Sequence, residues 1–224
     1  MGDGAHNRLP DPAEESPLTR ALFVICTLFL LAPLLALAAG TPQEAKSFLE
    51  KRHAEVIRIL KRPAPDQASK ETRDTEIRKA LAELLDFEEL SKRALEDHWA
   101  ARSAAEQQRF VELLGQLVER SYQKNLESTM DFRVTYESAT RKGDSLVVAT
   151  EAQSLKNRRS PPVAIDYTLV PVANSFRVYD VTTDGVSLVA NYKRQFNKII
   201  RRNGWDALIE RMEKKLTGDA ESPL

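Results

Sequence analysis

The 224-residue chain has little of what most catalytic and metal sites require: one cysteine, Cys26, three histidines and eight glycines. A single cysteine forms no internal disulfide and cannot supply the thiolates of a structural zinc site. The glycines are scattered, and none belongs to a phosphate-binding loop, a dinucleotide-binding fingerprint or the nucleophile elbow of a hydrolase. The sequence therefore predicts no cofactor and no metal, and it contains no recognisable catalytic motif.

An excess of charge is also missing, because 33 basic residues are matched by 33 acidic ones. Removing residues 1–38 would take away four acidic and two basic residues, so the remaining chain is only slightly positive. Domains that bind nucleic acids carry a clear basic excess, because they neutralise phosphates. No nucleic-acid partner is expected.

The longest uncharged segment covers 19 residues, 21–39. It is at the lower limit for a membrane span, and Arg20 stands immediately before it. Ala36-Leu37-Ala38 has the A-x-A pattern of a signal-peptide cleavage site. We therefore predict a leader with a signal peptide at 1–38 and a single domain at 39–224. A retained N-terminal membrane anchor is the alternative.

The segment before Arg20 is acidic, although signal peptides normally begin with basic residues. A start codon assigned too early would explain this, because a chain beginning near Leu18 has an ordinary short leader. Cys26 is lost with the leader, and the bulky Ile25 before it does not fit a lipoprotein anchor. An exported chain without disulfides favours a bacterial periplasm.

Helical patterns fill the first half of the remaining chain. Capping boxes begin at Thr41 and Ser103, and Asp86 is placed to cap a third helix. Apolar residues at helical spacing form stripes over residues 45–60, 77–85, 87–95 and 110–126, and a loop is predicted at 61–71.

From Asp131 the apolar period changes from 3.6 to 2. The segments DFRVTYES, SLVVATEA, VAIDYTLV and SFRVYDVTT alternate and are joined by short turns, which predicts a four-stranded antiparallel meander. In the last of these segments, strict alternation puts Val178 and Val181 on opposite faces. A helix is expected directly after Gly185, and Gly204 separates it from a final helix. The fold class is therefore α+β, a curved meander covered by N- and C-terminal helices.

Three polar residues are candidates for catalysis. His98 ends a helical pattern, where its charge would suit the helix dipole. Asp166 and Asp180 lie in predicted strands beside tyrosines, where a carboxylate could act as a general base. Inside a pocket these groups would favour an enzyme, whereas on the solvated surface each has an ordinary structural role.

Apolar residues are more numerous than one small sheet requires. Six helical stripes compete for its two faces, so a gap between sheet and helices is easily formed. A pocket lined by apolar side chains with few polar groups is the usual form of a site for an apolar ligand. A filled core is the alternative.

Two blocks of the chain, 86–126 and 178–212, resemble one known family. The matching elements of the first block are Asp86-Phe87, Arg93-Ala94-Leu95, His98-Trp99, Gln108-Arg109-Phe110 and Tyr122. Those of the second are Tyr179-Asp180-Val181, Gly185-Val186-Ser187-Leu188, Asn191-Tyr192, Gln195-Phe196, Ile199-Ile200, Gly204 and Leu208-Ile209. Their order resembles the periplasmic phospholipid-binding component of the Mla system, also called the toluene-tolerance family. Glu96 departs from the pattern, because the family usually has glycine there, and this leaves the local turn open.

The resemblance implies a carrier without catalytic residues that holds the acyl chains of a phospholipid in an apolar cavity between the sheet and the helices. It implies two further partners, an outer-membrane lipoprotein complex and an inner-membrane ABC transporter complex whose ATPase supplies the energy. We expect the cavity to be lined by Trp99, Leu117, Tyr122, Val163, Tyr167, Val186, Val189, Tyr192 and Phe196.

The helix after Gly185 also carries five basic residues, Lys193, Arg194, Lys198, Arg201 and Arg202. At about 100° per residue, the last four share one side of the helix and Lys193 lies away from them. This basic face is either a solvated helix surface or a docking surface for an acidic partner during lipid transfer.

Two other classes of function remain open at this point. An enzyme on a similar cone-shaped α+β fold would need one of the three polar candidates inside the pocket. An envelope adaptor that binds only protein would have a filled core. A phospholipid that co-purifies with the protein would distinguish the carrier from both.

Overall fold

The structure is a computed structural model that describes residues 40–218, without the side chains of residues 123–127. The predicted leader at 1–38 lies outside these residues. Among the described helices, none is both long enough and apolar enough to cross a membrane.

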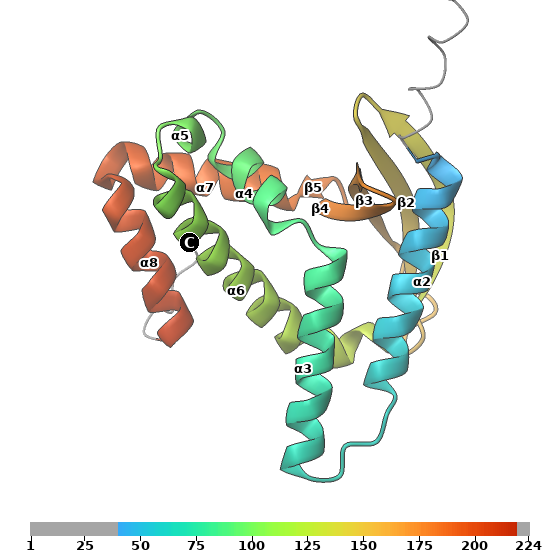
Figure 1. Cartoon of the computed structure of the whole chain (residues 1–224). Helices are drawn as coiled ribbons and strands as arrows, with labels where there is room; N and C mark the ends of the chain where they lie inside the picture. The colour runs from blue at the N-terminus through green and yellow to red at the C-terminus, as the bar shows by residue number, and fades with distance from the viewer. Residues whose placement is uncertain (1–39, 219–224) are drawn as a thin grey trace, which may run out of the picture. The chain divides into compact units, whose positions relative to one another are not determined.

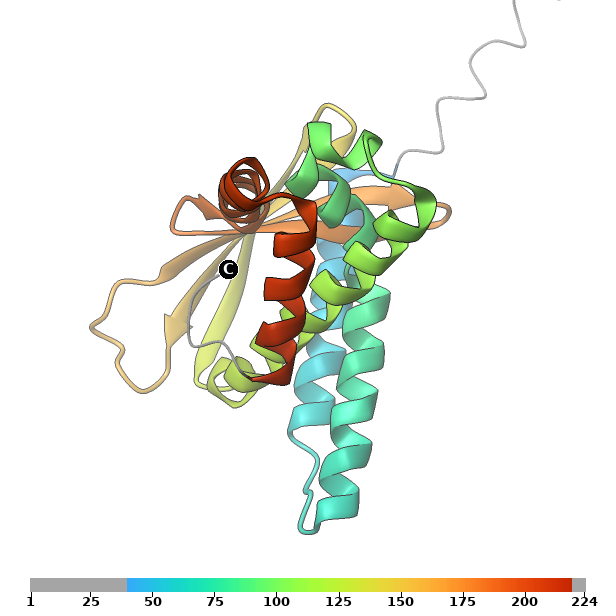
Figure 2. The same ribbon diagram turned by 90° about the vertical axis from the view of Figure 1, so that its left-hand side faces the viewer.

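The N-terminal half is helical: α2 (Pro42–Leu60), α3 (Gln67–Leu84), α4 (Phe87–Leu95), α5 (Asp97–Ala100) and α6 (Ala104–Thr129). The predicted capping box at Thr41 is present, with both of its hydrogen bonds to Glu44. Figures 1 and 2 show α2 and α3 side by side as a helical hairpin that extends away from the sheet.

The predicted loop at 61–71 is shorter than expected, because α3 begins at Gln67. The Asp66 carboxylate accepts a hydrogen bond from the Ser69 backbone N–H at 2.8 Å, and the Ser69 hydroxyl accepts one from the Asp66 N–H at 3.2 Å. This is a capping box with serine in place of the usual Glu or Gln, which explains why the sequence pattern did not reveal it.

The sheet contains β1 (Phe132–Lys142), β2 (Ser145–Ser154), β3 (Val163–Val172), β4 (Ser175–Thr183) and β5 (Val186–Ser187). The strands pair with their sequence neighbours, in the order β1-β2-β3-β4-β5, and every pair is antiparallel. The predicted α+β class and antiparallel meander are confirmed, but the four-strand count was wrong. The two-residue β5 returns along β4, and α7 (Leu188–Asn203) begins only after it.

An irregularity in β4 corrects the predicted alternation of that strand. Leu169 pairs with Val178 and Thr168 pairs with Asp180, so Tyr179 is an extra residue opposite β3. A bulge of this kind reverses the side-chain pattern beyond it. Val178 and Val181 therefore lie on the same face of the sheet, not on opposite faces.

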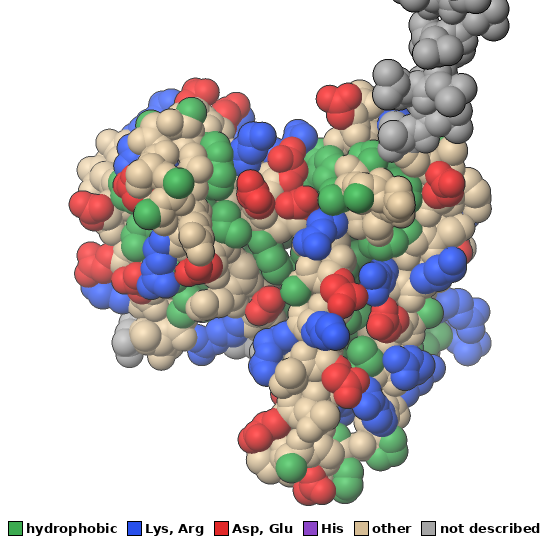
Figure 3. Space-filling view, in the orientation of Figure 1, with side chains coloured by type: hydrophobic (Ala, Val, Ile, Leu, Met, Phe, Trp, Pro, Cys, Tyr) green, Lys and Arg blue, Asp and Glu red, His purple; other side chains and the backbone are tan. Residues whose placement is uncertain are grey.

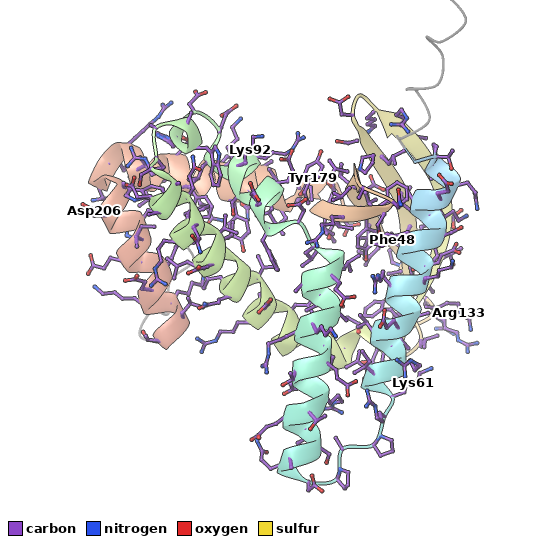
Figure 4. All side chains as sticks on the ribbon, in the orientation of Figure 1. Phe48, Lys61, Lys92, Arg133, Tyr179 and Asp206 are labelled. Carbon is purple, nitrogen blue, oxygen red and sulfur yellow. The ribbon has the colours of Figure 1, made fainter. Side chains whose placement is uncertain are left out.

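The inner part of the sheet's apolar face is covered by α2. Its buried residues are Leu146, Val148, Leu169, Phe176 and Val178 from the strands and Ala45 and Leu49 from the helix. Phe48 of α2 faces the sheet, and its ring lies 5.8 Å from that of Phe176 (Figure 4). This part of the interface is closed.

A second core lies among α4, α5, α6, α7 and α8 (Trp205–Thr217). It is filled by large side chains, with the Phe110 ring 5.4 Å from the Phe196 ring and in contact with Trp205 at 5.7 Å. Figure 2 faces this cluster and shows α8 alongside α6. The far part of the α2–α3 hairpin forms a third, smaller core around Ile59, Ile77 and Leu81.

Candidate functional site

The outer part of the sheet's apolar face is not covered by α2. Strand pairing places Val134, Ala152 and Val163 in one row across the sheet. The next row contains Tyr136, Thr150, Ile165, Thr183 and Val186. Paired residues point to the same side of a sheet, so both rows continue the face that carries Leu146 and Leu169.

We call Phe132, Val134, Val163, Ile165 and Val186 the outer apolar face. Phe132 is 37% exposed and Val186 is 60% exposed, whereas the leucines of the covered part are 0% exposed. The other three side chains are partly exposed. Met130 and Leu155, next to the strand ends, are also exposed. Exposed apolar side chains that gather on one face in this way often mark a site that binds an apolar ligand or partner.

Four of the nine residues predicted to line a cavity lie at or beside this face. Val163, Tyr167 and Val186 share its side of the sheet. Tyr122, near the end of α6, packs against the core of the α2–α3 hairpin and lies close enough to Tyr167 to affect its ionisation. These four residues lie at or beside the outer apolar face, and their contact with a ligand remains a prediction.

The other five predicted residues, Trp99, Leu117, Val189, Tyr192 and Phe196, lie in the helical core. The Tyr192 and Phe196 rings are stacked, with their centroids 5.2 Å apart. Because Phe196 and Leu117 are buried among helices, this group forms a packed body beside β4 and is separate from the outer apolar face.

Polar groups that the sequence did not single out lie next to the outer apolar face. His53 of α2 and Tyr136 of β1 are joined by a hydrogen bond of 2.8 Å between Nδ1 and the hydroxyl. Burial lowers the pKa of His53, so the neutral imidazole is favoured. In the sequence, only the alternation of Phe132, Val134 and Tyr136 indicated that the Tyr136 side chain lies on the apolar face. Its partner His53 is 83 residues earlier, so the pair could not be predicted before the fold was known.

Burial also raises the pKa of the neighbouring tyrosines. It raises that of Tyr167 to about 12, with a further contribution from Tyr122. The pKa of Tyr136 is raised mainly by burial and then by the nearby Tyr167 and Glu50. The pKa of Tyr122 is raised by burial alone. The three hydroxyls therefore remain protonated and form a small neutral polar group within apolar surroundings.

The three candidates for catalysis have structural partners or lie elsewhere. His98 Nε2 lies 2.7 Å from Asn197 Oδ1, a hydrogen bond that ties α5 to α7. The Asp180 carboxylate accepts hydrogen bonds from the Ser187 hydroxyl at 2.6 Å and the Val189 N–H at 3.0 Å, which fixes the start of α7 to the sheet. In the described part of the chain, no cluster of three or more His, Cys, Asp or Glu residues could hold a metal ion.

Asp166 lines a polar pocket of about 350 Å³ on the opposite face of the sheet, together with Thr168 and Thr182. The Arg93 guanidinium lies 4.3 Å from the centre of the Tyr179 ring, and the Tyr179 hydroxyl is 3.0 Å from that of Ser145. The two faces of the sheet thus differ: one is apolar, and the other carries hydroxyl and charged groups.

The basic face of α7 has the predicted geometry. Arg194, Lys198, Arg201 and Arg202 are exposed, while Lys193 is partly buried and forms an ion pair with Glu96 at 2.7 Å. Within residues 40–218, no ion pair with a carboxylate is found for any of the four exposed cations. In the space-filling view, hydrophobic side chains gather between the helical cluster and α3, and charged side chains cover the outer sides of α2 and α3 (Figure 3).

Comparison with known proteins identifies the family to which this chain belongs. The family model described as MlaC protein matches residues 50–214, which include the sheet, the outer apolar face and the helices around them. The chain belongs to the MlaC family. A curated relative, the intermembrane phospholipid transport system binding protein MlaC of Haemophilus influenzae, is 22% identical over 142 residues. That match covers 62% of this chain and 66% of the relative, just under two thirds of its length.

A solved structure shares the MlaC-type fold. It is a phospholipid-binding protein of Ralstonia solanacearum in complex with a phospholipid, and it matches with a TM-score of 0.66 at 21% sequence identity. The match covers 80% of this chain and 99% of that chain. The names of both relatives describe binding or transport and not a reaction.

Proposed function

We propose that this MlaC-family chain is a carrier that binds a phospholipid and moves it between membrane complexes. The acyl chains would lie against the outer apolar face, between the sheet and the helices that surround it. Both relatives are named for phospholipid binding or transport, which supports this assignment of the ligand.

The observation that carries the proposal is the half-covered apolar face of the sheet. The residues of its covered half are buried, whereas Phe132 and Val186 on the same face of the sheet are exposed to solvent. Each methylene removed from water contributes about 0.8 kcal/mol, so acyl chains gain strongly from such a surface. A lipid would complete the burial that α2 leaves unfinished.

The placement of the candidate polar groups favours a carrier over an enzyme. His98 and Asp180 are engaged in hydrogen bonds that join secondary-structure elements, and Asp166 lies on the polar side of the sheet. None of the three lies on the outer apolar face, where a substrate held by its acyl chains would sit. A protein-only adaptor would also use exposed apolar residues, but both relatives are named for phospholipid binding or transport, which favours the carrier.

The remaining parts of the proposal concern location and partners. The predicted signal peptide at 1–38 would direct the chain to the periplasm. There it would exchange lipid with an outer-membrane lipoprotein complex and an inner-membrane ABC transporter complex. The exposed cations of α7, which form no ion pair within residues 40–218, are suited to an acidic surface on such a partner, because opposite charges steer the encounter.

The test is native mass spectrometry of the protein purified from a Gram-negative periplasm, followed by lipid extraction. A bound species with the mass of a phospholipid, in near-stoichiometric amount, is the expected result. Protein that is free of lipid after gentle purification, and that takes up none from phospholipid vesicles, would overturn the proposal.

A further inference from the structure

Two tyrosine hydroxyls next to the outer apolar face have no partner. Within residues 40–218, the Tyr136 hydroxyl bonds to His53, whereas the hydroxyls of Tyr122 and Tyr167 make no hydrogen bond. Both side chains are largely buried against apolar neighbours. Neither hydroxyl is among the fully enclosed polar atoms of the described residues, so each can be reached by a ligand or by water.

The electrostatic surroundings of these hydroxyls identify the kind of acceptor they suit. Burial has the largest effect on the pKa values of Tyr122, Tyr136 and Tyr167. The smaller effects come from neighbouring tyrosines and from the carboxylate of Glu50. All of these raise the tyrosine pKa values. The cation nearby, Lys46, is held by the Tyr136 backbone carbonyl oxygen at 2.8 Å, whereas the neutral tyrosine hydroxyls can donate to a neutral carbonyl oxygen at little cost.

We infer that the hydroxyls of Tyr122 and Tyr167 bind the ester carbonyl groups of a diacyl lipid, and that they make the protein selective for ester-linked over ether-linked chains. This inference rests on the proposed function and names the part of the ligand recognised at that site. The ester groups join the polar headgroup to the acyl chains, so hydroxyls at the border of an apolar face are well placed to meet them.

His53 and Tyr136 have a supporting part in this arrangement. The Tyr136 hydroxyl is already bonded to the imidazole, and the Lys46 ammonium is held by the Tyr136 carbonyl oxygen at 2.8 Å. These bonds fix β1 against α2 and leave Tyr122 and Tyr167 as the free donors. The selectivity therefore depends on two hydroxyls from different elements, α6 and β3, whose side chains are close enough in the folded chain for Tyr122 to influence the ionisation of Tyr167.

The experiment is competitive loading of the delipidated full chain from vesicles. The vesicles contain equal amounts of dioleoyl phosphatidylglycerol and its diether analogue, which has the same headgroup and chain length but lacks the carbonyls. Native mass spectrometry gives the ratio of the two complexes. We expect the wild type to favour the ester lipid by about three- to tenfold, the effect of one to two neutral hydrogen bonds.

The double variant Tyr122→Phe/Tyr167→Phe should load both lipids about equally, and each single variant should lose part of the preference. Tyr179→Phe is the matched control, because that hydroxyl lies 3.0 Å from the Ser145 hydroxyl at the polar pocket, and it should keep the wild-type ratio. A wild type that loads both lipids equally, or a double variant that keeps the preference, would overturn the inference while leaving the carrier function intact. A wild type that loads neither lipid would instead contradict the proposed function.

Discussion

The ammonium of Lys193 and the carboxylate of Glu96 lie 2.7 Å apart, and this ion pair joins the turn between α4 and α5 to α7. Glu96 has a φ of 48° and a ψ of −118°, a region that glycine adopts far more readily than other residues. Backbone strain thus coincides with the position where the sequence departs from the family resemblance. The glutamate gains an ion pair at the cost of an unfavourable turn.

Replacing Glu96 by glycine should therefore stabilise the protein. Relief of the positive φ contributes about 1 kcal/mol or more, and the half-exposed ion pair that is lost contributes about 0–1 kcal/mol. Glu96→Ala is the control, because it removes the ion pair and keeps the strain. Urea unfolding should rank the glycine variant above the alanine variant by about 1 kcal/mol. Equal stabilities would show that the turn is not strained.

The outer apolar face is tested by a charge on Val186. Val186→Glu should fold, because the side chain is exposed, but it should lose most of its bound lipid. A carboxylate among acyl chains costs several kcal/mol unless it is protonated. Val172→Glu is the matched control, since Val172 is also exposed and lies on the other face of β3. Unchanged lipid content in the Val186 variant would place the ligand elsewhere.

The basic face predicts a stabilising charge reversal at Lys198. This residue has Arg194 one turn before it and Arg201 and Arg202 one turn after it. Each like-charge pair at such spacing costs about 0.2–0.5 kcal/mol, so Lys198→Glu should raise the free energy of unfolding by about 1 kcal/mol at low salt. The gain should shrink as salt is added. A gain that is independent of salt would need another cause.

The same face should affect association with a transport partner. Arg194→Glu/Lys198→Glu should slow binding to the purified inner-membrane transporter complex and weaken its salt dependence, with lipid content unchanged. Lys70→Glu/Lys79→Glu makes the same change in charge on α3, where both lysines are exposed, and should have the smaller effect. Equal association rates for the two variants would mean that α7 is an ordinary solvated helix.

Asp180 is predicted to matter for stability and not for chemistry. Asp180→Ala leaves the Ser187 hydroxyl and the Val189 N–H without their acceptor, which should cost about 1–3 kcal/mol. Asp180→Asn keeps one acceptor oxygen and should lose less. Thermal unfolding measures the change, and lipid extraction should show wild-type lipid content in the folded fraction of both variants.

His53 should make stability depend on pH in mildly acidic solution. Because burial lowers its pKa in the folded protein, the unfolded chain binds a proton first as the pH falls below about 6.5. Stability is therefore full above that value and declines as the pH falls toward the lowered pKa. His53→Gln should flatten the decline measured by urea unfolding at pH 7.5 and 5.5. An unchanged slope in the His53 variant would contradict the assignment.

Local patterns predicted much of the fold. The capping box at Thr41, the apolar stripes of the helices and the change of period at Asp131 depend on neighbouring residues, so the sequence displays them directly. The bulge at Tyr179 cannot be read from neighbouring residues, because it is defined by a change in the pairing register between β4 and β3. The capping role of Ser69 and the two-residue β5 were missed for a similar reason, since neither has a distinctive local pattern.

The candidate site was harder to predict than the elements that build it. Val163 and Tyr167 could be placed on one face by alternation within β3. Val189 and Phe196 are equally apolar, yet they pack inside a filled helical core, and residue type does not distinguish the two situations. The contact between His53 and Tyr136 depends on how α2 lies across the sheet, which only the folded chain defines.

The cover that α2 provides over the inner half of the sheet has a consequence for directionality. Leu146, Val148 and Leu169 are fully covered in that half, and the opposite face of the sheet is polar. A ligand on the outer apolar face would therefore enter and leave on the uncovered side of the sheet. The lipid would then follow the same path when it is loaded and when it is released. Under the proposed carrier function, the protein would have no preferred direction of its own. Net flux would then be set by the relative affinities of the donor and the acceptor for the lipid.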